Sequence, residues 1–182
     1  MLTLAFLPAD SELLESHWLN SMASKLAPSG SAVPKIHVEL LFPESSNDKD
    51  VIGRACSIHY DGEVFLEPKR FSRKQWQFRQ VSCTKAQMKK ALEFCEAHIG
   101  EKFNHFGYFL HPIAPCQITP HTMQRLGLSP APRWFCTEIV SGALQASGAM
   151  SDIPLSCHPE KLFQLVKDLT APTCPKHSDI KF

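Results

Sequence analysis

Hydrophobic residues recur at two spacings along the chain, and the two spacings predict different elements. Short apolar runs and alternating stretches predict strands over residues 2–7, 36–42, 51–60, 63–67 and 76–81. Asp61-Gly62 is typical of the tight turn of a hairpin between two of these strands. The stretch PESSNDKD, residues 43–50, predicts a polar turn region.

Helical spacing predicts four helices, over residues 12–26, 85–99, 136–147 and 159–169. Asp10 or Ser11 can cap the first, and Thr84 with Gln87 forms a capping box before the second, which we expect to bury Ile99 and end at Gly100. Gly148 ends the third, and Pro159 opens the last. Residues 101–133 hold five prolines and little periodicity, which predicts a long loop.

This order of elements predicts an α+β fold, with a central antiparallel sheet packed by helices. We expect one domain over residues 1–170 and a loose tail over residues 171–182.

Composition and charge are those of an ordinary globular protein, with 43% hydrophobic and 20% charged residues. The net charge of +1 gives no global field toward nucleic acid, so no nucleic-acid partner is expected. No apolar run approaches the ~20 residues that span a bilayer, so we expect no transmembrane segment. The first residues lack a basic leader and quickly become acidic, which favours a first strand over a signal peptide and predicts a cytoplasmic location.

The seven cysteines are irregularly spaced, and none forms a CxxC pair. An odd count without regular spacing argues against a disulfide framework, so we expect most of these thiols to be buried and inert. His105, His111, Cys116 and His121 lie in the long loop but lack the spacing of a standard zinc site. We therefore expect neither a metal nor a cofactor.

Cys136 is the exception among the cysteines, because it stands where a helix begins. The positive end of a helix dipole favours a thiolate, which needs a base to act as a nucleophile. His37 begins the strongest strand, and Glu39 shares its face, opposite Val38 and Leu40. A carboxylate can orient an imidazole, but spacing alone leaves open a solvated strand face and a cysteine used only for packing.

Three motifs in a fixed order favour the catalytic interpretation of Cys136 and His37 over the packing and solvated-face interpretations. They are IHVELLF, then EFCEAHIGEKFNHFGYF, then WFCTEIVSGALQASG. Together they resemble the circularly permuted branch of the NlpC-type papain-like cysteine hydrolases, the YiiX- and YaeF-like proteins, which are related to lecithin:retinol acyltransferase-like proteins. His37 precedes Cys136, as the permutation requires, and SCHPEKLFQLV is similar to the closing element of such chains. The resemblance covers about residues 2–169, and Thr137 replaces the usual serine.

The resemblance implies a permuted papain-like (NlpC-type) fold with its nucleophile at a helix N-terminus. Cys136 would be the nucleophile, His37 the general base and Glu39 the third residue, with His59 and, more weakly, Ser57 as competitors for that third role. The implied reaction is hydrolysis or acyl transfer through an acyl-enzyme, at an amide, isopeptide, thioester or ester bond of a peptide, isopeptide or lipid substrate. The alternatives are a catalytically inactive binding or scaffold protein on the same fold, or a lipid-processing acyltransferase.

Residues 67–79, EPKRFSRKQWQFR, interleave five basic residues with aromatic ones. Such a pattern can bind nucleic acid or a phospholipid head group, but it is more typical of an amphipathic edge strand with its charges in water. The sequence leaves the oligomeric state open.

Overall fold

The computed structural model describes residues 1–13, 27, 32–59, 62–105 and 120–170. The helix predicted over residues 12–26 lies almost entirely outside these residues, as does the predicted tail over 171–182.

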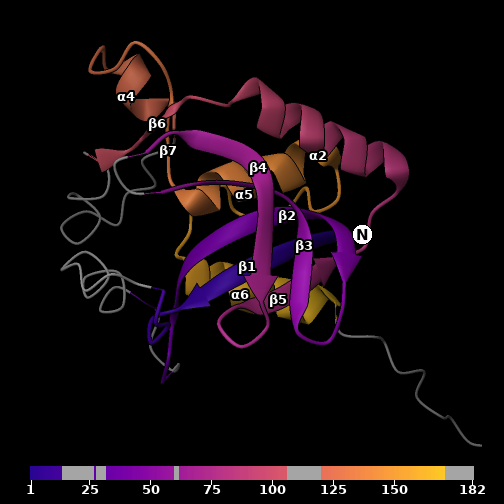
Figure 1. Cartoon of the computed structure of the whole chain (residues 1–182). Coiled ribbons are helices and arrows are strands. Elements are labelled where there is room, and N and C mark those ends of the chain that lie inside the picture. The colour runs from indigo at the N-terminus through magenta and orange to yellow at the C-terminus, as the bar shows by residue number, and fades with distance from the viewer. Residues whose placement is uncertain (14–26, 28–31, 60–61, 106–119, 171–182) are drawn as a thin grey trace, which may run out of the picture.

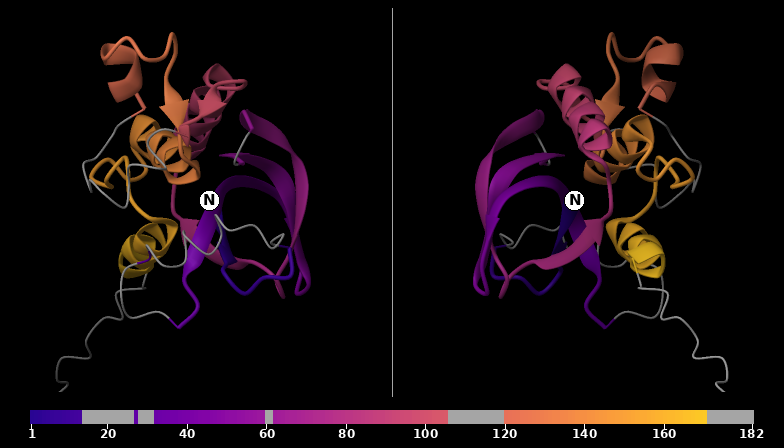
Figure 2. Two further views of the ribbon diagram at one scale, coloured as in Figure 1. Left: turned by 90° about the vertical axis from the view of Figure 1, so that its left-hand side faces the viewer. Right: turned by 90° about the vertical axis from the view of Figure 1, so that its right-hand side faces the viewer.

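Among the described residues, five strands form one antiparallel sheet in the order β4-β3-β2-β1-β5 (Figure 1). The strands are β1 (Leu2–Pro8), β2 (Lys35–Ser46), β3 (Asp50–Ile58), β4 (Val64–Ser72) and β5 (Gln77–Val81). β1 lies between β2 and β5, and all seven of its residues are buried. The sheet curls round strongly, and the longer helices lie together on one side of it (Figure 2). The predicted α+β class with a central antiparallel sheet is confirmed.

β2 and β4 are both longer than predicted. The turn predicted over residues 43–50 was too long, because β2 continues through Pro43 to Ser46. An irregular register between Pro43 and Ser45 accommodates the proline, which has no N–H to donate to a ladder. The Oδ1 atom of Asn47 then accepts hydrogen bonds from the N–H groups of Lys49 and Asp50, each at 2.8 Å, and closes a much shorter turn.

The helices on this side of the sheet are α2 (Lys85–Ala97), α5 (Cys136–Ser147) and α6 (Pro159–Thr170). The capping box of α2 is confirmed: Gln87 N–H donates to Thr84 Oγ1 at 3.1 Å, and Thr84 N–H donates to Gln87 Oε1 at 2.9 Å. α5 ends at Gly148, whose φ of 71° is left-handed, as a C-terminal glycine should be. Ile99 was predicted to be buried but is 53% exposed, because α2 ends at Ala97 and the helical face no longer directs it.

Residues 101–133 hold more regular structure than predicted. The two-residue strand β6 (Lys102–Phe103) pairs in parallel with β7 (Arg133–Trp134), and a single turn, α4 (Thr122–Arg125), lies between them in the chain. β7 ends one residue before the N-cap of α5, so this pairing helps to fix where α5 begins.

Two hydrophobic clusters cover the two faces of the sheet. The larger lies between the sheet and the helices and includes Val38 and Leu40 of β2 with Ile139 of α5. The smaller lies on the other face and includes Leu41 and Trp76. None of the helices in the described ranges has the length and apolar content needed to cross a bilayer.

Candidate active site

β2 places His37 and Glu39 on the sheet face that bears the smaller hydrophobic cluster. Their neighbours Val38 and Leu40 belong to the larger cluster under the helices, so alternation directs the two polar side chains away from it. They are not on a solvated face, since Glu39 has an exposed fraction of 0% and the His37 side chain one of 15%. A buried acid and a largely buried histidine two residues apart need partners.

A β-bulge immediately precedes His37. Leu7 pairs with His37, but the next residue, Pro8, pairs with Lys35, so Ile36 is an extra residue on β2. Bulges bend a strand, increase its local twist and re-aim the adjacent side chain, and they are frequent beside active sites.

Cys136 is the first residue of α5, as the sequence predicts. The preceding residue, Phe135, has extended backbone and donates its N–H to the Oε2 atom of Glu138 at 2.9 Å. The first N–H groups of a helix have no acceptor within it, so those of Cys136 and Thr137 are available to an external oxygen. The helix start therefore offers a thiol and backbone donors side by side.

Cys136 and His37 are far apart in the sequence, but the fold brings their side chains close enough together for the thiol to act on the imidazole. Burial disfavours the charged form of His37, but the negative charge and the hydrogen bond of Cys136, together with Glu39, outweigh burial and raise the pKa of His37 to about 9. An imidazole in this position is protonated when the neighbouring thiol is ionised.

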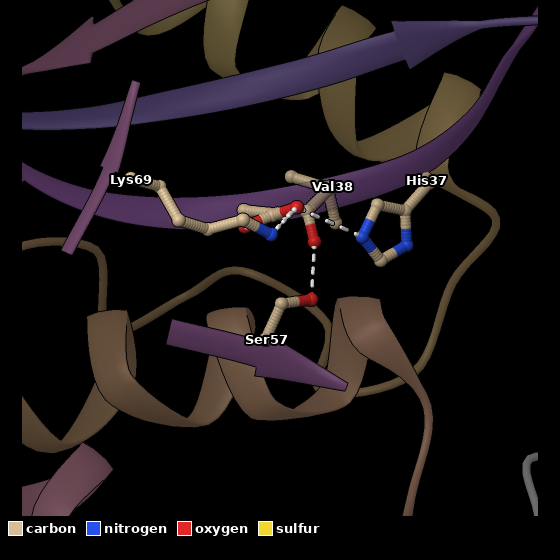
Figure 3. A network of polar contacts seen from close by, with 5 residues as sticks. His37, Val38, Ser57 and Lys69 are labelled. Atoms are coloured by element: carbon tan, nitrogen blue, oxygen red, sulfur yellow. Dashed lines mark hydrogen bonds and ion pairs between the residues drawn. The ribbon is translucent and has the colours of Figure 1, made fainter. Parts of the chain in front are cut away.

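Glu39 also lies beside the imidazole, with its Oε1 atom 3.5 Å from Nε2 of His37. Lys69 of β4 donates from Nζ to both carboxylate oxygens, at 3.0 and 3.1 Å (Figure 3). Burial alone would raise the pKa of Glu39, but the hydrogen bond and charge of His37 and the charge of Lys69 lower it instead. Glu39 is therefore a buried, ionised carboxylate between two cations.

The two competitors for the third role make other contacts. The ring of His59 stacks on that of His37, with centroids 5.2 Å apart and planes 28° apart, so the two rings meet face to face. Partial desolvation and the positive charges of His37 and Lys69 lower the pKa of His59 to about 4, so it stays neutral. Ser57 donates its hydroxyl to the Val38 carbonyl at 2.7 Å, which fixes the backbone between His37 and Glu39 (Figure 3).

Lys69 is the residue that the sequence reasoning missed. The basic stretch over residues 67–79 was expected to hold its charges in water, which is wrong for Lys69, whose side chain is only 25% exposed. The available signal was the small residues Gly53, Ala55 and Ser57 at alternate positions of β3, which leave room above that strand.

The other described cysteines, Cys56, Cys83, Cys95 and Cys157, are free thiols like Cys136. Burial, with a contribution from the nearby charge of Cys136, raises the pKa of Cys157 to about 12, so that thiol stays protonated. In the described part of the chain, no three histidine, cysteine or acidic side chains gather as metal ligands. His111 and Cys116 lie outside that part. A cavity of about 420 Å³ lies at the far end of α5 from Cys136, beside Gly148, Met150 and Leu165.

Comparisons of this chain with protein-family models, with curated proteins and with solved structures find no match.

Proposed function

We propose that the chain is a cysteine-dependent hydrolase or acyltransferase, with Cys136 as nucleophile, His37 as general acid and base, and Glu39 as the residue that orients His37. One observation carries the proposal: the thiol of Cys136, at the start of α5, lies next to the largely buried imidazole of His37, and Oε1 of Glu39 lies 3.5 Å from that ring. The resemblance to permuted NlpC-type papain-like hydrolases supports the same assignment.

The reaction begins with attack of the Cys136 thiolate on the carbonyl carbon of an amide, isopeptide, thioester or ester. The oxygen of the tetrahedral intermediate accepts hydrogen bonds from the backbone N–H groups at the start of α5. The bond to the leaving group breaks as the imidazolium of His37 gives it a proton, which leaves an acyl group on Cys136.

The second half of the reaction, deacylation, regenerates the enzyme. Neutral His37 takes a proton from water, or from another acceptor nucleophile, as that molecule attacks the thioester. The thioester bond breaks, the Cys136 thiolate departs, and the proton stays on His37 beside it. Glu39 stabilises the imidazolium in both halves and holds the ring in place.

The first test needs no substrate: the pH dependence of iodoacetamide alkylation at each cysteine, followed by peptide mass spectrometry. We expect Cys136 alone to react rapidly below pH 7, and His37→Ala to slow it by about 10²-fold or more. The control His121→Ala changes an exposed histidine and should leave the rate unchanged. If Cys136 reacts no faster than the half-buried Cys83, the enzyme assignment fails and a scaffold role replaces it.

The second test detects the acyl-enzyme. Short acyl thioesters, esters and peptide amides are each mixed with the protein, and intact mass is recorded after rapid quenching. A productive class should add one acyl mass, on Cys136, and release one equivalent of leaving group in a burst. Cys136→Ala should show neither signal.

A further inference from the structure

Lys69 reaches Glu39 from two strands away, with β3 between them. In the register of the β3–β4 pair, Lys69 lies opposite Gly53, and the next pairs on the same face place Ala55 and Ser57 along the way to Glu39. These three side chains are small or absent, so β3 leaves space for the lysine stem to lie over it. A side chain cannot replace the hydrogen at Gly53, since a Cβ there would stand 2.2 Å from the Phe42 carbonyl oxygen.

The ammonium group of Lys69 is held from several sides. Besides its two contacts with Glu39, its Nζ atom lies 4.6 Å from the ring centroid of Phe65 and 5.9 Å from that of Phe71. By contrast, Nε2 of His37 lies 3.5 Å from Oε1 of Glu39, farther than Nζ of Lys69 lies from either carboxylate oxygen. Lys69 thus holds the carboxylate more closely than His37 does.

We propose that Lys69 is a positioning residue of the candidate active site, which fixes Glu39 beside His37, keeps it ionised, and so sets the pH range in which the thiolate–imidazolium pair exists. The proposal rests on the function proposed above, because it assigns Lys69 a role through Glu39 and His37. It gives the site a fourth member, supplied by the edge strand of the sheet.

The net charge of the site predicts in which direction loss of Lys69 moves the pH profile of Cys136. The described groups that face Glu39 and His37 are Lys69, the neutral His59 and Cys136. With Lys69 present, the ionised set of thiolate, imidazolium, carboxylate and ammonium sums to zero. Without Lys69 the same buried set carries −1, so it keeps an additional proton to higher pH.

The test compares the pH profile of Cys136 alkylation in wild type, Lys69→Met and Lys69→Arg. We expect Lys69→Met to move the profile to higher pH by about one unit. Lys69→Arg keeps the positive charge and should give the wild-type profile. Lys74→Met is the matched control, because Lys74 is an exposed lysine close by in the chain. A Lys69→Met profile that superimposes on the wild-type profile overturns the proposal, since loss of packing alone changes the rate and not the pH dependence.

A second comparison keeps the proposal falsifiable if Lys69→Met disturbs the fold. In the double variant Glu39→Gln with Lys69→Met, the partner through which Lys69 is proposed to act is already absent, so loss of Lys69 should move the profile less than it does beside an intact Glu39. An equal shift in the two backgrounds would mean that Lys69 does not act through Glu39, and would overturn the assignment. His37→Ala separates this failure from failure of the proposed function, which would leave Cys136 insensitive to His37.

Discussion

Glu138 is a buried acid two residues after the candidate nucleophile, and its exposed fraction is 0%. Burial raises its pKa from 4.5 to about 8, although hydrogen bonds from the Phe135 N–H and the Ser156 side chain oppose the change. The side chain is thus mostly protonated at neutral pH. At the first turn of α5, Glu138 therefore acts as a neutral hydrogen-bonding group. It does not supply a negative charge that would interact with the helix dipole.

Glu138 therefore predicts a pH-dependent stability. The folded state keeps a proton on Glu138 between pH 4.5 and about 8, whereas the unfolded state releases it, so stability falls as pH rises through this window. Glu138→Gln imitates the protonated acid, and we expect it to remove a slope of up to about 1.4 kcal/mol per pH unit. Urea unfolding of both proteins from pH 4 to pH 8 measures the difference. Parallel curves would show that Glu138 does not hold its proton.

His37 offers a second prediction at the same scale. We expect its imidazole to titrate near pH 9 in wild type, and well below this value in Cys136→Ala, because the thiolate that offsets burial is gone. NMR of the ring carbon-bound protons follows this titration directly. His59 serves as an internal control, since its pKa of about 4 keeps it uncharged in the same spectra. A His37 titration that is unchanged in Cys136→Ala would show that Cys136 and His37 do not interact as a pair.

At the scale of elements, α5 lies close against α2 at Gly142. A Cβ at Gly142 would stand 2.7 Å from Cζ of Phe94, nearer than such atoms can approach. Phe94 cannot easily yield, because its ring stacks on His98 with centroids 4.1 Å apart. This close contact fixes the position of the helix that carries Cys136.

Gly142→Ala should therefore destabilise the protein, by about 1–3 kcal/mol. Helix propensity alone predicts the opposite, a gain of about 1 kcal/mol over glycine. Equilibrium urea unfolding decides between the two. Phe94→Leu in the Gly142→Ala background should recover part of the loss by removing the clashing ring atom, and a stabilised Gly142→Ala protein would disprove the close contact.

At the scale of the whole molecule, Glu160 of α6 fastens the last helix to the sheet. Its Oε2 atom accepts the backbone N–H of Lys35 at 2.8 Å in a buried contact, at the beginning of β2. The same helix places Phe163 under the guanidinium of Arg79, 3.8 Å from the ring centroid. Through these contacts, α6 anchors both the beginning of β2, the strand that carries His37, and β5.

Removing this hydrogen bond leaves a buried backbone N–H without an acceptor. We expect Glu160→Ala to cost about 1–3 kcal/mol of unfolding free energy, and Glu160→Gln, which keeps an acceptor oxygen, to cost less. Denaturant unfolding measures both. Glu93→Ala on the exposed side of α2 is the control and should change stability by less than about 0.5 kcal/mol. Equal effects of Glu160→Ala and Glu93→Ala would exclude the fastening role.

Local patterns predicted the local features of this fold. Alternation predicted that His37 and Glu39 share a face, helical spacing predicted where α5 begins, and Gly148 predicted where it ends. Contacts between distant segments could not be predicted this way: nothing in the spacing joins Cys136 to His37, and only the resemblance suggested it. Lys69 was missed because its contact depends on the register of β3 with β4 and on the curl of the sheet, neither of which appears in a single strand.

The place of β1 in the sheet has a consequence for the growing polypeptide on the ribosome. β1 precedes both of its neighbours in the chain, and it pairs with β5 from Leu2 opposite Val81 to Phe6 opposite Gln77. Its apolar residues therefore leave the exit tunnel long before the second partner is synthesised. During this interval an unpaired, mostly apolar strand edge is open to other chains, so we expect chaperones that bind nascent chains to engage it and to release it only after residue 81 has emerged.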